Sequence, residues 1–315
     1  TLFRSTFFMK YGWCRYAYKD YCIQLNTYRG KFIIKEMVGF TGWNLFAGLA
    51  MIGRNQGVAV IINIFLGTIA NAAYGVANQI NGALGHFSAT FQKAINPQLM
   101  KSEGMNDRNR LFRISFISSK FSVLALAFFA VPFIMEMDEV LTLWLKDNIP
   151  PFTLKLAQYI LLLSITYQYS VGIMAAIQAT GKIRNYQIIM GSFLLMNIPI
   201  AYVILKMGYS VYYTTIAFVI LELTSLCVRL FMANKLTGMS VKEYIQNVIQ
   251  PTMIIIVIPV IIAMIPHFMI SNSFLKLVIV CSIYCLLFAV LMFRFAFDEG
   301  QREHIKSKIQ HLLKR

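Results

Sequence analysis

Eight apolar segments of 18 to 28 residues follow one another along most of this chain. An α-helix of about 20 apolar residues crosses the hydrocarbon core of a bilayer, and only helices or closed barrels satisfy their backbone groups there. With 58% hydrophobic and 13% charged residues, the composition excludes an ordinary soluble domain. The sequence therefore predicts an all-α, polytopic membrane helix bundle of about eight transmembrane helices, at residues 40–65, 72–95, 114–135, 152–179, 186–205, 212–233, 251–268 and 274–293.

The formal net charge of +16 follows the alternation of these segments. If residues 1–35 are cytoplasmic, 24 of the 29 Lys and Arg residues fall in or beside inner segments, and Arg229 is counted among them. This asymmetry is the positive-inside rule, which explains the charge without a nucleic-acid partner. It predicts that residues 136–151 lie outside and that the basic tail lies inside.

Polar side chains interrupt the first span. Arg54 lies near its middle, and Gln56 and Asn63 follow on the same segment. A charged side chain at the bilayer centre costs at least about 3 kcal/mol, so such groups usually face a bundle interior or a wet cavity. We expect these three residues to contact substrate; the alternative for Arg54 is a structural cation that binds helix-end carbonyls or snorkels.

The second span carries a further polar stripe. Its polar residues and one glycine recur at spacings of three, four and seven residues, which places them along one side of a helix: Asn71, Asn78, Gln79, Gly82, His86 and Lys93. This pattern predicts a second wall of the same substrate site, with Asn78, Gln79, His86 and Lys93 as its contact residues. Two alternatives remain open: interhelical hydrogen bonding with close approach at the neighbouring glycines, and snorkelling of Lys93 toward the inner surface.

Glu222 lies centrally in the sixth span, where a carboxylate has to be protonated or paired with a cation. It is the candidate for ion coupling, and a structural ion pair is the alternative. The four histidines and five cysteines show no spacing typical of a catalytic triad, zinc site or disulfide framework. We expect no enzymatic activity, no metal and no cofactor.

Several short motifs follow one another along the chain. They are Phe40-Thr41-Gly42-Trp43, Gln56-Gly57, Asn63-Ile64-Phe65-Leu66-Gly67, Asn71-Ala72-Ala73-Tyr74-Gly75-Val76-Ala77, Asn96-Pro97-Gln98, Lys101-Ser102, Ser119-Lys120-Phe121, Leu141-Thr142-Leu143-Trp144-Leu145, Ala179-Thr180-Gly181-Lys182-Ile183, Tyr186 and Arg229-Leu230. In this order they resemble the second half of bacterial polysaccharide flippases, the Wzx-like members of the MOP (multidrug/oligosaccharidyl-lipid/polysaccharide) exporter superfamily. The resemblance covers most of the chain from about Tyr16 onward.

The resemblance implies a MATE-like fold of two six-helix lobes, with two extra helices at the C-terminus. Residues 1–39 would hold the end of a preceding helix and a cytoplasmic basic loop, and residues 40–250 would form the second lobe. Residues 251–297 would be the two additional helices, and residues 298–315 a basic cytoplasmic tail. Because the family has two lobes, we expect this chain to be the C-terminal part of a longer transporter.

The activity that the resemblance implies is the flipping of lipid-linked, undecaprenyl-diphosphate oligosaccharide across the bacterial inner membrane for surface polysaccharide biosynthesis. Its partners would be the lipid bilayer, the lipid-linked oligosaccharide, and the polysaccharide polymerase and glycosyltransferases of the same pathway. Two alternatives stay open at this point. One is a cation-coupled multidrug exporter of the same superfamily, and the other is a non-transporting membrane subunit of the polysaccharide assembly machinery.

Overall fold

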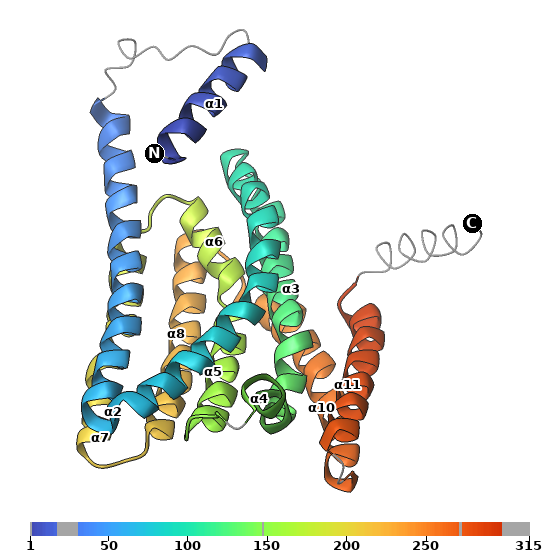
Figure 1. The fold of residues 1–315 in the computed structure, drawn as a ribbon. Helices are drawn as coiled ribbons and strands as arrows, with labels where there is room; N and C mark the ends of the chain where they lie inside the picture. The colour runs from blue at the N-terminus through green and yellow to red at the C-terminus, as the bar shows by residue number, and fades with distance from the viewer. Residues whose placement is uncertain (1, 18–30, 147, 271–272, 298–315) are drawn as a thin grey trace. The chain divides into compact units, whose positions relative to one another are not determined.

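The computed structural model describes residues 2–17, 31–146, 148–270 and 273–297, and every regular element in these ranges is a helix (Figure 1). The predicted all-α fold is thereby confirmed. The helices are α1 Leu2–Ala17, α2 Lys31–Gly104, α3 Arg108–Met135, α4 Met137–Leu145, α5 Thr153–Gln168, α6 Val171–Ala179, α7 Arg184–Lys206, α8 Val211–Thr237, α9 Val241–Tyr244, the π-helix η1 Ile245–Ile249, α10 Gln250–Met269 and α11 Ser273–Phe295.

Seven helical stretches in the described part of the chain are long and apolar enough to cross a membrane, so this is a multi-pass membrane protein. The first of them is α2, whose 74 residues would extend about 110 Å as a straight helix. Gly67 interrupts it with a φ of 77° and a ψ of −177°, a conformation that glycine adopts without a steric penalty. Figure 1 shows that α2 consists of two arms that run in different directions. The two arms of α2 correspond to the first two predicted spans.

The chain divides into two compact units, Thr1–Gly42 and Trp43–Arg315. The first unit holds α1 and the start of α2, and the second holds the remainder of α2 and α3 to α11. Residues 31–39, expected in a loop, are already helical. The expected basic tail, residues 298–315, lies outside the described residues.

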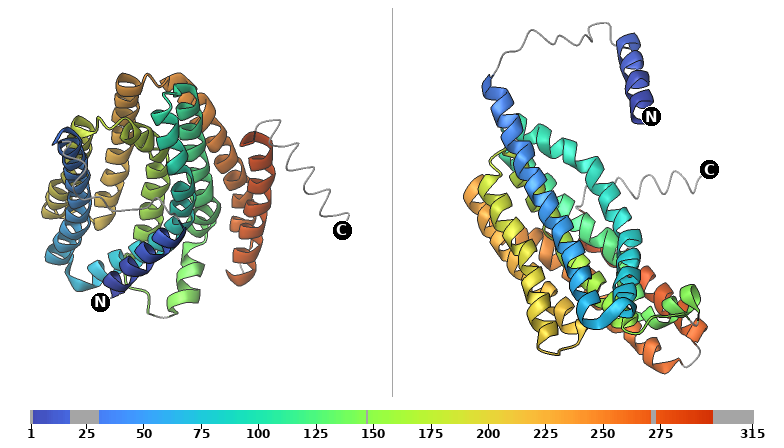
Figure 2. Two further views of the ribbon diagram at one scale, coloured as in Figure 1. Left: turned by 90° about the horizontal axis from the view of Figure 1, so that it is seen from above. Right: turned by 60° about the vertical axis from the view of Figure 1, so that its left-hand side comes forward.

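Within the second unit the helices pack in the order α7, α8, α5, α3, α10 and α11, as the view from above in Figure 2 shows. The first arm of α2 packs along α7, where Phe46 meets Gly191 and Ile198 meets Gly57. The second arm packs on α3 through stacked Phe87 and Phe129 rings. The two arms of α2 therefore contact helices from different parts of the row.

The fourth predicted span is broken into α5 and α6 at Tyr169 and Ser170. Gly172, the second residue of α6, lies directly against α3, and a Cβ atom there would lie 2.0 Å from the carbonyl oxygen of Ser115. The hydroxyl of Ser119 on α3 donates to Tyr169 O and accepts from the Gly172 N–H, both at 3.0 Å. The break leaves backbone groups without intrahelical partners, and α3 satisfies them. The break is therefore stabilised by contacts with α3.

One ion-paired cluster holds the α10–α11 pair to α3 and α4. Glu136, between α3 and α4, is 2% exposed, and its Oε1 atom lies 2.7 Å from Nδ1 of His267 on α10. Nζ of Lys276 on α11 lies 3.7 Å from Glu136 Oε2 and 3.2 Å from Glu139 Oε1 on α4. The segment predicted as an outer loop thus contains a short helix that anchors the last two spans.

Candidate functional site: a polar cavity

A cavity of about 470 Å³ lies among α2, α5, α6, α7 and α8, within the second unit. Its volume falls in the range of about 300 to 1,000 Å³ typical of ligand pockets. Most of the lining surface is apolar, yet 13 of the 25 lining residues are polar or charged. The polar and charged lining residues are Asn44, Arg54, Tyr74, Asn78, Asn81, Ser164, Tyr167, Gln168, Gln178, Tyr186, Gln187, Glu222 and Arg229.

Arg54 reaches this cavity from the first arm of α2 and is half-buried. Its Nε atom donates to Asn55 Oδ1 at 3.1 Å. Among the described residues no carboxylate lies within ion-pair distance of it. The guanidinium thus presents hydrogen-bond donors and a positive charge to the cavity.

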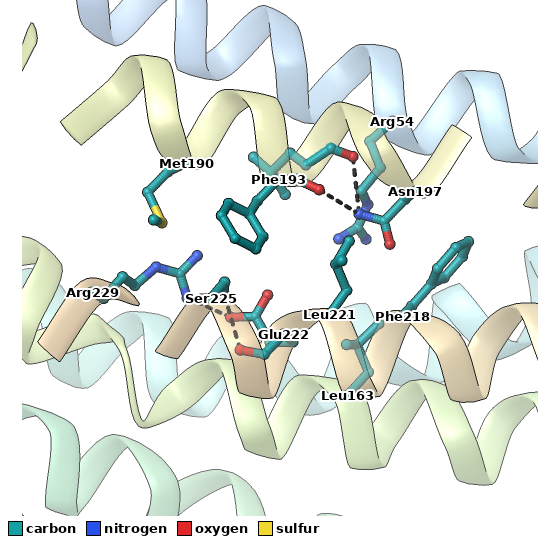
Figure 3. A pocket seen from close by; sticks show the side chains of 11 residues that line it. Arg54, Leu163, Met190, Phe193, Asn197, Phe218, Leu221, Glu222, Ser225 and Arg229 are labelled. Carbon is teal, nitrogen blue, oxygen red and sulfur yellow. Dashed lines mark hydrogen bonds and ion pairs between the residues drawn. The ribbon is translucent and has the colours of Figure 1, made fainter. Parts of the chain in front are cut away.

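Glu222 and Arg229 form a buried ion pair on α8. Nη1 of Arg229 lies 2.5 Å from Oε1 of Glu222. Figure 3 shows the pair on one side of a narrower pocket, with Arg54 entering from α2 beside Asn197. The carboxylate therefore has the structural cation that the sequence analysis gave as the alternative to ion coupling.

Arg229 lies deeper in the helix bundle than its sequence position suggested. The charge count placed it with the inner-side cations, yet it is 3% exposed and lies inside α8. Its Nη1 atom also donates to the hydroxyl of Ser170 at 2.7 Å, and its guanidinium lies over the Tyr167 ring, 5.7 Å from the centroid. Arg229 therefore ties α8 to the break between α5 and α6.

The face of the second arm of α2 that lines the cavity shares only Asn78 and Gly82 with the predicted stripe. Asn78 lines the cavity, together with Tyr74, Asn81, Gly82 and Gly85. No heavy atom lies within 4 Å of where a Cβ would stand at Gly82 or Gly85, so these two glycines do not mark the close helix approach that was the alternative. They widen the cavity instead.

Five predicted contact residues do not line this cavity: Gln56, Asn63, Gln79, His86 and Lys93 are exposed. Successive helix residues differ by about 100° in direction. Gln79 is therefore turned well away from Asn78, and His86 and Lys93 lie toward the edge of the face that Asn81 and Gly85 define. Of the predicted contact residues, Arg54 and Asn78 lie at the cavity, as does Glu222.

Two amide contacts that the sequence analysis missed connect the cavity walls. Gln187 on α7 donates to Asn44 Oδ1 on α2 at 3.0 Å. The side-chain oxygen of Gln168 accepts from Ser88 at 2.7 Å and from Gln92 at 3.0 Å. These residues lie 76 to 143 positions apart from their partners, and no local pattern indicates such pairing.

The charges in the lining favour anions. Arg229 is neutralised by Glu222, so Arg54 leaves one positive charge in excess. Guanidinium groups bind phosphate and carboxylate oxygens through paired N–H donors. No three His, Cys, Asp or Glu side chains in the described ranges are grouped so that they could hold a metal ion.

Comparisons with protein-family models, with curated proteins and with solved structures gave no match for this chain. The class of this protein is therefore described from its structure alone. It is a multi-pass membrane bundle of helices around a cavity that is lined by polar and apolar side chains and carries an excess positive charge.

Proposed function

We propose that this chain forms one lobe of a transporter that moves a lipid-linked, anionic oligosaccharide across the bacterial inner membrane. The substrate class is an undecaprenyl-diphosphate sugar. Arg54 carries the proposal, because it is a charge at membrane depth that lines a cavity and has no carboxylate partner in the described ranges. The diphosphate would supply that partner while the lipid tail stays in the bilayer.

The exposed polar residues of α2 support a second lobe. Gln56, Asn63, Gln79 and His86 are exposed within the first two spans. Polar side chains at membrane depth usually face protein or water rather than lipid. In a two-lobe transporter these residues would face the partner lobe or the water-filled path between the lobes, where rocking of the lobes alternates access.

The cation-coupled drug exporter is the weaker candidate. It would need Glu222 as a free carboxylate for a cation, but Arg229 already neutralises that group. Arg54 would also repel cationic cargo in a cavity of low dielectric constant. The charge balance therefore favours an anionic substrate.

The experiment is surface-polysaccharide export from strains with substitutions in the chromosomal gene. We expect Arg54→Ala to lose most of the export and Arg54→Lys to keep part of it, because lysine retains the charge without the planar fork. Arg113→Ala is the matched control, since Arg113 is exposed on α3 and lies outside the cavity. Full export by a normally expressed Arg54→Ala protein would overturn the proposal.

A further inference from the structure

Two buried donors at the cavity wall lie beside each other and have no other hydrogen-bond partner among the described residues. They are Nε of Arg229 on α8 and the hydroxyl of Tyr186 on α7. The residues are 3% and 1% exposed, and both line the cavity. A buried donor without a partner costs about 1 to 3 kcal/mol in a folded protein, so such groups usually have a ligand or an ordered water.

The surroundings of Arg229 fix its guanidinium. Nη1 is engaged by Glu222 and Ser170, and the plane lies over the Tyr167 ring. These contacts hold the Nε–H edge of the guanidinium in place. The Tyr186 hydroxyl lies beside the guanidinium, within reach of a hydrogen bond from it, so the two groups contact only each other until a ligand accepts from both.

We propose that Arg229 and Tyr186 form a second oxyanion subsite in the cavity, separate from Arg54. The Nε–H of Arg229 and the O–H of Tyr186 donate to one oxyanion, and the proton of Tyr186 stays on the hydroxyl. This inference rests on the proposed function and deepens it, because it gives the substrate a second anionic contact. The oxyanion is either a phosphate of the carrier diphosphate or a sugar carboxylate, which present similar acceptor oxygens.

The charge balance sets what this subsite accepts. The charged and titratable side chains around it are Arg54, Tyr167, Glu222 and Arg229 itself. Glu222 cancels the charge of Arg229, so the subsite contributes oriented donors rather than net charge. Arg54 supplies the net attraction for the anion, and the subsite selects where a second acceptor group sits.

The test is calorimetric titration of the purified full chain with inorganic pyrophosphate and, separately, with glucuronate. Tyr186→Phe removes the hydroxyl and keeps the ring. Tyr202→Phe is the control, because Tyr202 is on the same helix, packs on Phe65 and does not line the cavity. Both substitutions are made in the wild type and in an Arg54→Gln background, which removes the first cation.

We expect Tyr186→Phe to weaken binding of at least one probe by about tenfold, the loss of one hydrogen bond to a charged group. Tyr202→Phe should leave binding unchanged. The probe that responds identifies the source of the oxyanion. Arg229→Lys keeps a cation beside Glu222 and loses the Nε donor, so it should weaken the same probe.

Equal affinities of Tyr186→Phe and Tyr202→Phe for both probes would overturn the subsite, as would a wild type that binds neither. These outcomes are distinct from failure of the proposed function. If Arg54→Ala loses export but Tyr186→Phe does not change binding, the transport proposal stands and the subsite proposal is wrong. If Tyr186→Phe weakens binding but Arg54→Ala exports normally, the subsite proposal stands and the transport proposal is wrong.

Discussion

Glu222 and Arg229 lie seven residues apart on α8, and their Oε1 and Nη1 atoms are 2.5 Å from each other. Both side chains are buried. Removal of one partner of a buried pair leaves an uncompensated charge, whereas removal of both does not. The stability of the protein with either charged residue therefore depends on the presence of the other.

Arg229→Met should lower the free energy of unfolding in detergent by about 3 to 5 kcal/mol, because Glu222 then lacks its counter-ion. The double variant Arg229→Met/Glu222→Gln should recover much of that loss. Denaturant titration of the four proteins in a double-mutant cycle measures the coupling. Additive losses would show that the pair contributes no interaction of its own.

The limits of most spans follow from hydropathy alone. The predicted segment 212–233 became α8, Val211–Thr237, and the predicted segment 186–205 became α7, Arg184–Lys206. The pairing of Glu222 also follows from local spacing, since seven residues are nearly two helical turns. Arg229 was not predicted as the partner because it lies near the inner end of the predicted span and was counted with the loop cations.

No local sequence pattern predicts the break between α5 and α6. Neither Tyr169 nor Ser170 is a helix breaker, and the break depends on contacts with Ser115 and Ser119, which lie about 50 positions earlier. The lining of the second α2 arm likewise depends on which helices pack beside it. Long-range packing of this kind is not encoded in the periodicity of one segment.

Gly172→Ala tests the close contact between α6 and α3. Its Cβ would stand 2.0 Å from a backbone oxygen, so the helices have to separate. We expect a loss of about 1 to 3 kcal/mol in the free energy of unfolding. Gly75→Ala is the control, since no atom lies within 4 Å of that position. Equal stabilities of the two variants would contradict the packing.

Glu136→Gln tests the attachment of α10 and α11. The substitution removes the charge that faces His267 and Lys276 and keeps the size of the side chain. We expect faster proteolytic cleavage near the α10–α11 turn, because this end of the helix pair loses its main ionic contact. Asp138→Gln, at an exposed position on α4, should leave the cleavage rate unchanged. A Glu136→Gln protein as resistant as the wild type would contradict this role.

The positive-inside orientation predicts that Asn106 and Asn148 lie on opposite sides of the membrane, since the single span α3 separates the segments that contain them. In intact cells, an impermeant maleimide should label Asn148→Cys and not Asn106→Cys, each in a background without the native cysteines. Labelling of both cysteines from the outside would contradict the topology.

The most direct test of the transport proposal is a flipping assay with the protein, as its own gene expresses it, reconstituted in proteoliposomes. The assay follows the fraction of an undecaprenyl-diphosphate oligosaccharide that is accessible to an external glycosidase. We predict that the wild type and Arg113→Ala expose the inner-leaflet substrate with time, and that Arg54→Ala is slower by at least about tenfold. Equal rates in Arg54→Ala and wild type, or no movement by the wild type, would contradict the account.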